Sequence, residues 1–112
     1  MGRRTLAIDF DGVIAEGRSN DYRKLTLMAG VRPALEALKD WRLVVFTCRC
    51  NFEGGRQIVV DFLKLHKLEG YFEDITDVKP VAAYYIDDHA VRFHSWRNTL
   101  DTLNVLEAKS AS

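Results

Sequence analysis

The chain carries no surplus of charge of either sign, since sixteen lysine and arginine residues are balanced by sixteen aspartate and glutamate residues. It therefore lacks the overall basic field that favours nucleic acid or an anionic membrane, and we expect neither partner. A local basic patch is compatible with neutrality, so nucleic acid is not excluded. The sequence also contains no apolar run near the roughly 20 residues of a membrane-spanning helix.

Cysteine is scarce, and the two that occur, Cys48 and Cys50, are separated by a single residue. Side chains two residues apart on a strand share a face, but the extended backbone keeps their Cα atoms roughly 6.6 Å apart, so a disulfide between them is not expected. No further cysteine is present to complete a thiolate metal site. The start of the chain, residues 1–4, leads directly into an apolar run and does not resemble a signal peptide, so we expect a cytoplasmic protein with reduced thiols.

The 112 residues, 47% of them apolar and 29% charged, are typical of a soluble globular protein with one domain. We expect this domain to cover residues 1–112, with a flexible tail at about 109–112. Residues 12–30 show little periodicity and are expected to form a flap.

Short apolar runs at residues 6–8, 43–46, 71–76 and 82–86 predict four strands. Apolar residues at helical spacing predict three amphipathic helices: one from Val31 with Pro33 in its first turn, one from Ile58 to a C-cap at Gly70, and one from Trp96. Strands that alternate with helices are typical of a three-layer α/β fold. We expect a Rossmann-like domain with a small parallel sheet of about four strands between two helical layers.

Polar residues stand at, or soon after, the carboxyl end of each predicted strand. They are Asp9 and Asp11 after the first strand, Thr47 after the second, Lys79 after the third, and Asp87 and Asp88 after the fourth. The carboxyl ends of parallel strands share one edge of the sheet, where ligands bind in α/β folds. Each residue alone would also suit a solvated loop, but the whole set in this order predicts one functional site.

These residues resemble the four motifs of the haloacid dehalogenase-like superfamily, in order, over about residues 6–93. Asp9-Phe10-Asp11-Gly12-Val13 is similar to the first motif, Phe46-Thr47 to the second, Lys79-Pro80 to the third and Ile86-Asp87-Asp88 to the fourth. The resemblance implies a Rossmann-like domain, a Mg²⁺ cofactor and phosphoryl transfer through an aspartyl-phosphate. Dehalogenases of the superfamily lack the second carboxylate of the first motif, so Asp11 points to phosphate chemistry.

The chemistry of a phosphate ester indicates a role for the residues around the first and second motifs. Asp9, at the rigid end of a buried strand, is the expected nucleophile. Asp11 is expected to act as general acid for the leaving oxygen and then as base for water. Thr47 is expected to donate its hydroxyl to a phosphoryl oxygen, with an ordinary strand residue as the alternative. Gly12 permits a sharp turn towards the substrate.

An anionic phosphate ester resists attack by a carboxylate, so we expect cations around it. A Mg²⁺ ion is expected among oxygens of Asp9, Asp11, Asp87 and Asp88, with the contribution of Asp11 coming from a nearby backbone carbonyl and that of Asp88 either direct or indirect. Lys79 is expected to add a second positive charge.

Arg49 and Asn51, which follow Thr47, are expected to bind the phosphate or leaving group of the substrate, with a solvated loop as an equal alternative. The spacing of the motifs leaves no room for a cap domain, so a bulky substrate or a neighbouring subunit would have to cover the site. We favour a small phosphorylated molecule and a homo-oligomer. Two alternatives stay open: an end-processing phosphatase for nucleic acid, and a non-catalytic metal- or phosphate-binding module with the same fold.

Overall fold

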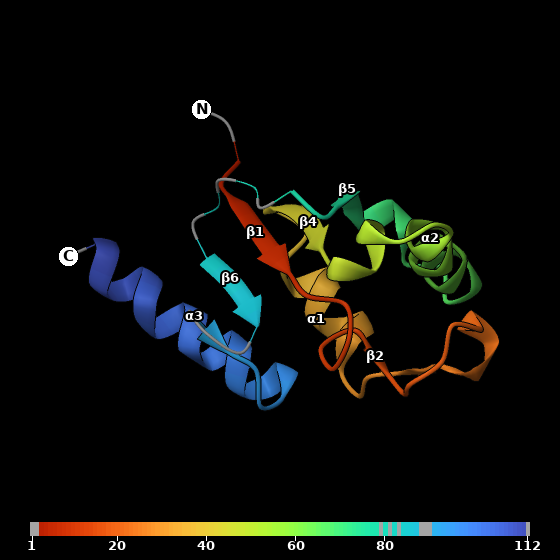
Figure 1. Cartoon of the computed structure of the whole chain (residues 1–112). Coiled ribbons are helices and arrows are strands. Elements are labelled where there is room, and N and C mark those ends of the chain that lie inside the picture. The colour runs from red at the N-terminus through yellow and green to blue at the C-terminus, as the bar shows by residue number, and fades with distance from the viewer. Residues whose placement is uncertain (1–2, 79, 81, 83, 88–90, 112) are drawn as a thin grey trace.

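A five-stranded, all-parallel sheet forms the centre of the computed structural model, which describes residues 3–78, 80, 82, 84–87 and 91–111 (Figure 1). The strand order is β5-β4-β1-β6-β7. The strands are β1 (Thr5–Ile8), β4 (Arg42–Phe46), β5 (Phe72–Thr76), β6 (Tyr84–Asp87) and β7 (Val91–Arg92). The four longer strands confirm the predicted parallel sheet, whereas the sequence pattern does not predict the two-residue edge strand β7.

In the part of the chain that the structure describes, three α-helices accompany the sheet: α1 (Val31–Ala37), α2 (Gly55–Leu65) and α3 (Trp96–Ala111). Pro33 lies in the first turn of α1, as predicted. Helix α3 continues through residue 111, where we expected a flexible tail. The short 3-10 helices are η1 (Tyr22–Lys24), η2 (Cys48–Asn51) and η3 (Glu69–Tyr71). No helix within the described residues is long and apolar enough to cross a membrane.

The predicted C-cap of α2 at Gly70 is wrong. Helix α2 ends at Leu65, and Lys67 takes the left-handed conformation with φ 57°. The Leu68 amide donates to the Leu63 carbonyl at 2.8 Å and the Lys67 amide to the Lys64 carbonyl at 3.1 Å, which is a Schellman motif. A lysine therefore occupies the position where glycine is usual, and the sequence pattern could not reveal it.

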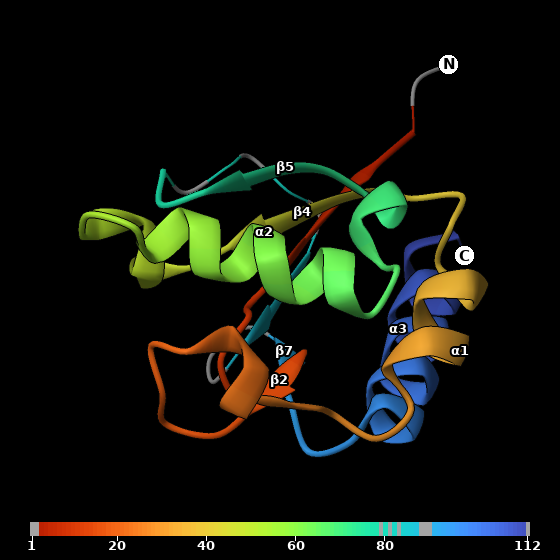
Figure 2. The same ribbon diagram turned by 90° about the vertical axis from the view of Figure 1, so that its right-hand side faces the viewer.

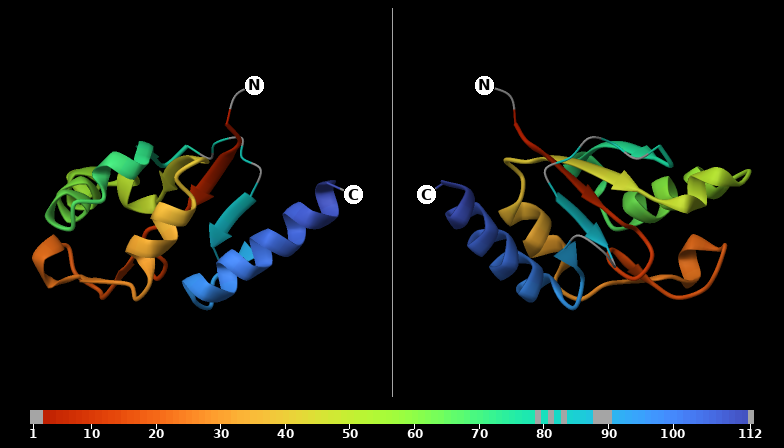
Figure 3. Two further views of the ribbon diagram at one scale, coloured as in Figure 1. Left: turned by 180° about the vertical axis from the view of Figure 1, so that it is seen from behind. Right: turned by 60° about the vertical axis from the view of Figure 1, so that its left-hand side comes forward.

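All three helices lie on one face of the sheet (Figures 2 and 3). Leu6 and Ile8 of β1 belong to the buried cluster that the helices share, whereas Ala7 between them is only 2% exposed but lies outside this cluster. The crossovers from β1 to β4 and from β4 to β5 run in the same direction, and their right-handedness places α1 and α2 on the same face. Helix α3 packs against α1.

The second helical layer that we expected is therefore not found among the described residues. Of the connection from β5 to β6, the structure describes residues 77, 78, 80 and 82, and none of these is helical. The Tyr85 hydroxyl donates to the Pro80 carbonyl at 2.5 Å, which ties this connection to β6. A helix in this return connection would have supplied the second layer.

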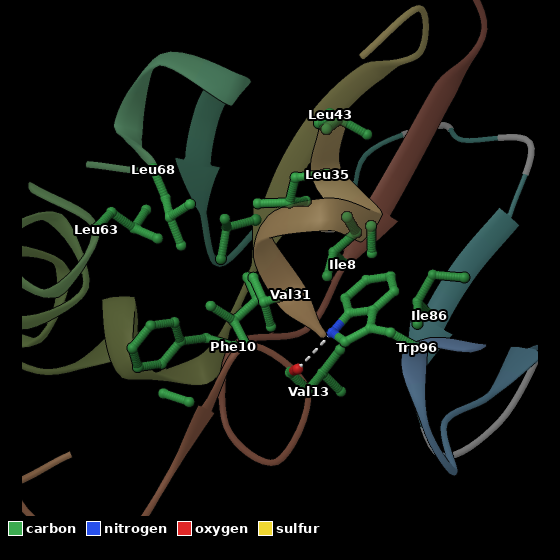
Figure 4. Packing of buried hydrophobic residues seen from close by; sticks show 14 of the residues in the cluster. Ile8, Phe10, Val13, Val31, Leu35, Leu43, Leu63, Leu68, Ile86 and Trp96 are labelled. Carbon is green, nitrogen blue, oxygen red and sulfur yellow. Dashed lines mark hydrogen bonds between the residues drawn. The ribbon is translucent and has the colours of Figure 1, made fainter. Parts of the chain in front are cut away.

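The core anchors the loop that follows β1 (Figure 4). The Trp96 indole N–H donates to the Val13 carbonyl at 3.1 Å. Phe10, fully buried, meets the Phe62 ring edge-on with 5.3 Å between the ring centroids. Because Phe10 lies between Asp9 and Asp11 in the chain, its burial holds both carboxylates at the edge of the sheet.

The flap (residues 12–30) is more ordered than its sequence pattern predicts. It contains the antiparallel pair β2 (Ala15–Glu16) and β3 (Thr26–Leu27), with η1 between them. The Asp21 side chain caps η1 by accepting from the Arg23 amide at 3.0 Å.

We expect Phe62→Ala to lower the free energy of unfolding by about 3–5 kcal/mol, because it removes a fully buried ring that supports Phe10. Urea denaturation followed by circular dichroism measures the change. Leu65→Ala, at a position 55% exposed on the same helix, is the control and should change the stability by about 0.5 kcal/mol or less. Equal losses in the two variants would contradict this packing.

Candidate active site at the carboxyl edge of the sheet

The parallel register brings the ends of four strands to one edge. Ile8 pairs with Val45 on one side and with Ile86 on the other. The Asp9 amide donates to the Ile86 carbonyl at 3.1 Å, and the Thr47 amide donates to the Thr76 carbonyl at 2.9 Å. Backbone hydrogen bonds thus link Asp9 to β6 and Thr47 to β5 just beyond the strands.

Two predicted site residues, Lys79 and Asp88, lie outside the described residues. The backbone of Asp87 is described and ends β6, next to Asp9 across the β1–β6 pair, but its side chain is not described. The expected convergence of the first and fourth motifs is therefore supported by the backbone register at Asp87.

Asp9 lines a cavity of about 210 Å³ with Phe46, Cys48, Asn51 and Asp77. One Asp9 carboxylate oxygen accepts from the Phe10 amide at 2.7 Å, which fixes its orientation. The other described polar groups of this cavity are a carboxylate, an amide and a thiol. Within the described lining there is no basic side chain, so a cation for an anionic substrate would come from elsewhere.

Asp77 and Cys48 are two residues of this cavity that the sequence reasoning missed. Asp77 directly follows β5, so the rule that identified Asp9 would have found it. Cys48 is an exposed free thiol. Burial raises the pKa of the neighbouring Cys50 thiol, with Asp77 contributing, which favours its neutral form.

Asp11 lines a separate and larger cavity of about 660 Å³. Its described lining residues are Asp11, Gly12, Glu16, Gly17, Arg18, Met28 and Arg49. Each of the two chain segments therefore contributes to both cavities: Asp9 and Cys48 line one, and Asp11 and Arg49 line the other. The expectation that both carboxylates of the first motif gather in one pocket is not what the described residues show.

The Asp11 carboxylate is held by Arg49 in a bidentate ion pair. Arg49 Nε lies 2.8 Å from Oδ2 of Asp11, and Nη2 lies 2.8 Å from Oδ1. The Arg49 side chain is 9% exposed and that of Asp11 is 42% exposed. Asp11 raises the pKa of the Arg49 guanidinium, chiefly through these hydrogen bonds. The third nitrogen, Nη1, donates to the Ser19 carbonyl at 3.1 Å, so each nitrogen of the guanidinium has a partner within the protein.

Thr47 is 1% exposed and lines neither of these two cavities as described. Its hydroxyl oxygen accepts from the Arg49 amide at 3.2 Å and so caps the 3-10 helix η2. The hydroxyl proton is not used in this bond. In the described arrangement Thr47 thus orients the segment that carries Arg49.

Gly12 makes the sharp turn that its sequence position predicts. Its φ is 77°, and its amide donates to the Ala15 carbonyl at 2.8 Å. The Phe10 carbonyl accepts from the amides of Ile14 and Ala15 at 2.9 and 3.1 Å. The loop after β1 therefore closes tightly on itself, and this determines the position of Asp11.

The described donor groups suit a hard cation such as Mg²⁺. Asp9, Asp77 and Asn51 offer side-chain oxygens in one cavity. No group of three or more His, Cys, Asp or Glu residues with metal-binding geometry occurs among the described residues. Two of the expected ligands, the Asp87 and Asp88 side chains, lie outside that set.

No family model, curated protein or solved structure matches this chain.

We expect Gly55→Ala to disrupt the site, because a Cβ at this position would lie 1.7 Å from the Arg49 carbonyl oxygen. The substitution should cost about 2–3 kcal/mol of stability and displace η2, as overpacking does in tight structures. Thermal unfolding measures the cost. Gly70→Ala is the control, since a Cβ there meets nothing within 4 Å, and an equal effect of both changes would refute the close approach.

Proposed function

We propose that this protein is a magnesium-dependent phosphohydrolase that cleaves a phosphate monoester, with Asp9 as the nucleophile. The observation that carries the proposal is the convergence at one edge of the sheet: Asp9 is bonded through its backbone to the strand that ends at Asp87 and faces a cavity with oxygen donors. The resemblance of the four sequence motifs to those of haloacid dehalogenase-like phosphatases supports the same reaction.

Because Asp9 and Asp11 line different cavities, we assign them different roles in the reaction. The Asp9 carboxylate attacks phosphorus and forms an aspartyl-phosphate, while the bond to the ester oxygen breaks. Asp11, in the neighbouring cavity, takes up a proton from solvent, to which its half-exposed carboxylate is open, and then donates it to the departing oxygen. It then takes a proton from the water that hydrolyses the aspartyl-phosphate. The larger cavity on the Asp11 side would receive the leaving group.

Mg²⁺ would be held by Asp9 and Asp87, with Asp88, Asp77 and the Asp11 backbone carbonyl as further candidates. When bound, it supplies positive charge that reduces the repulsion between the carboxylate and the phosphate. Lys79, in the third motif, would add a second positive charge. The Asp11 carboxylate is engaged with Arg49, which leaves it less available for direct metal binding.

The substrate we propose is a small phosphorylated molecule in the cytoplasm. The residues between the motifs are used by the flap, by the helices and by the strands of the sheet, which supports a domain of the capless type. A homo-oligomer would cover the open side of the site. Static light scattering that shows a monomer with efficient turnover of small sugar phosphates would contradict the oligomer.

We expect Asp9→Asn to abolish hydrolysis of p-nitrophenyl phosphate in the presence of Mg²⁺, with a loss of at least about 10³-fold in kcat, because the amide cannot act as the nucleophile. Chelation by EDTA should have the same effect on the wild type. Asp101→Asn, on the exposed side of α3, is the matched control and should retain activity. A wild type inactive on a broad panel of phosphoesters would instead favour the non-catalytic module.

Binding of Mg²⁺ should raise the melting temperature. At a hundredfold excess over Kd the stabilisation is about 2.7 kcal/mol, equivalent to several degrees for a domain of this length. Differential scanning fluorimetry measures the shift, which Asp87→Asn should largely remove and Asp101→Asn should leave intact. An Asp87→Asn shift equal to that of the wild type would place the ion elsewhere.

A further inference from the structure

The tip of the flap, residues 16–20, forms one wall of the Asp11 cavity. Glu16, Gly17 and Arg18 line this cavity together with Asp11 and Arg49. The position of the flap tip therefore decides how wide the cavity is and what can enter it.

The two ends of the flap are anchored in the core, but its tip is not. Ile14 is fully buried before the tip, and Leu25 is 4% exposed after it. The Met28 amide donates to the Ile14 carbonyl at 2.8 Å, and η1 packs against α2. Residues 16–18 and 20 are exposed. A small number of contacts must therefore determine where the tip lies.

Arg49 supplies the contact that reaches the flap tip. Its Nη1 donates to the Ser19 carbonyl at 3.1 Å. Of the hydrogen bonds within the described residues, this one alone ties residues 17–20 to a part of the chain outside the flap. Because Nε and Nη2 hold Asp11, one buried guanidinium joins the general acid and the flap tip. A lysine could not make these contacts together, since it lacks the planar fork of donors.

Arg49 is itself rigidly placed. Its guanidinium lies over the Phe10 ring, 5.5 Å from the centroid, and its amide donates to the Thr47 hydroxyl oxygen. Its carbonyl is in close contact with Gly55. The backbone of Arg49 is thus held by Thr47 and by the start of α2, and a side chain so fixed can anchor a loop.

We propose that Arg49 is the positioning residue of this site: it orients the Asp11 carboxylate and holds the flap tip as a lid over the leaving-group cavity. The flap then provides on the Asp11 side the cover that a cap domain or a second subunit would otherwise supply. The catalytic part of this inference rests on the proposed function, whereas the hold of Arg49 on the flap tip does not.

Limited proteolysis tests the lid without reference to activity. Trypsin cleaves after Arg18, which is exposed in the flap tip. Arg49→Gln should raise the rate of this cleavage about tenfold, because the tip loses its tether. Arg49→Lys keeps a positive charge beside Asp11 but loses the fork, and should release the tip as well. The matched control is Arg56→Gln, since Arg56 is an exposed arginine that donates to the Ile75 carbonyl at 3.1 Å.

Mass spectrometry identifies the cleavage site, and cleavage after Lys64 in α2 serves as the internal reference for global unfolding. The Asp11 side chain is already 42% exposed, so water can solvate its carboxylate when Arg49 is replaced. No unpaired buried charge is created, and we therefore expect the variants to fold. If both Arg49 variants are cleaved after Arg18 at the wild-type rate, the proposal that Arg49 holds the flap tip is refuted.

Steady-state kinetics tests the positioning role. Arg49→Gln should lower kcat about 10²-fold with little change in KM, because a misoriented acid slows the chemical step and not substrate binding. Arg49→Lys should restore part of kcat, and Arg56→Gln should match the wild type. A raised KM at unchanged kcat would make Arg49 a substrate-binding residue and overturn its positioning role. The two proposals can also fail separately. If the Arg49 variants release the flap tip but the wild type hydrolyses no phosphoester, the lid is supported and only the proposed function is refuted.

Discussion

Strand β1 pairs in parallel with β4 on one side and β6 on the other, and this pairing decides where the polar residues lie. Because Ile8 is in register with both Val45 and Ile86, the three strands end at the same edge. A shift of one residue in β1 would exchange its two faces and turn Asp9 from the edge cavity towards the core or the opposite surface. The hydrogen bond from the Asp9 amide to Ile86 extends the register one residue beyond the strand.

The half-buried ion pair between Arg49 and Asp11 is the second constraint on the site. Such pairs lose much of their Coulombic energy to desolvation, so their presence is better explained by the arrangement they impose than by net stability. Here the pair connects the loop after β1, the segment after β4 and the flap, which are far apart in the chain. Asp9 lines one cavity at this edge of the sheet and Asp11 lines another.

Some elements could be predicted because their cause is local. Parallel strands are buried on both faces, so Leu43 to Phe46 appear as a continuous apolar run. The stripe of α1 and the turn at Gly12 also follow from local residues. The end of α2 could not be predicted, because Lys67 adopts a conformation that its side chain disfavours. Nor could β7, since two residues at a sheet edge carry no periodic pattern.

The sequence by itself determined the alternation of strands and helices and the placement of aspartates at strand ends. The sequence also predicts that Asp9 and Asp87 lie close together, because the apolar runs and their order along the chain are enough to predict a parallel sheet. Only the tertiary structure decided that Arg49 engages Asp11 and that the helices share one face. These outcomes depend on side-chain directions and chain paths between segments distant in sequence, and no local pattern encodes them.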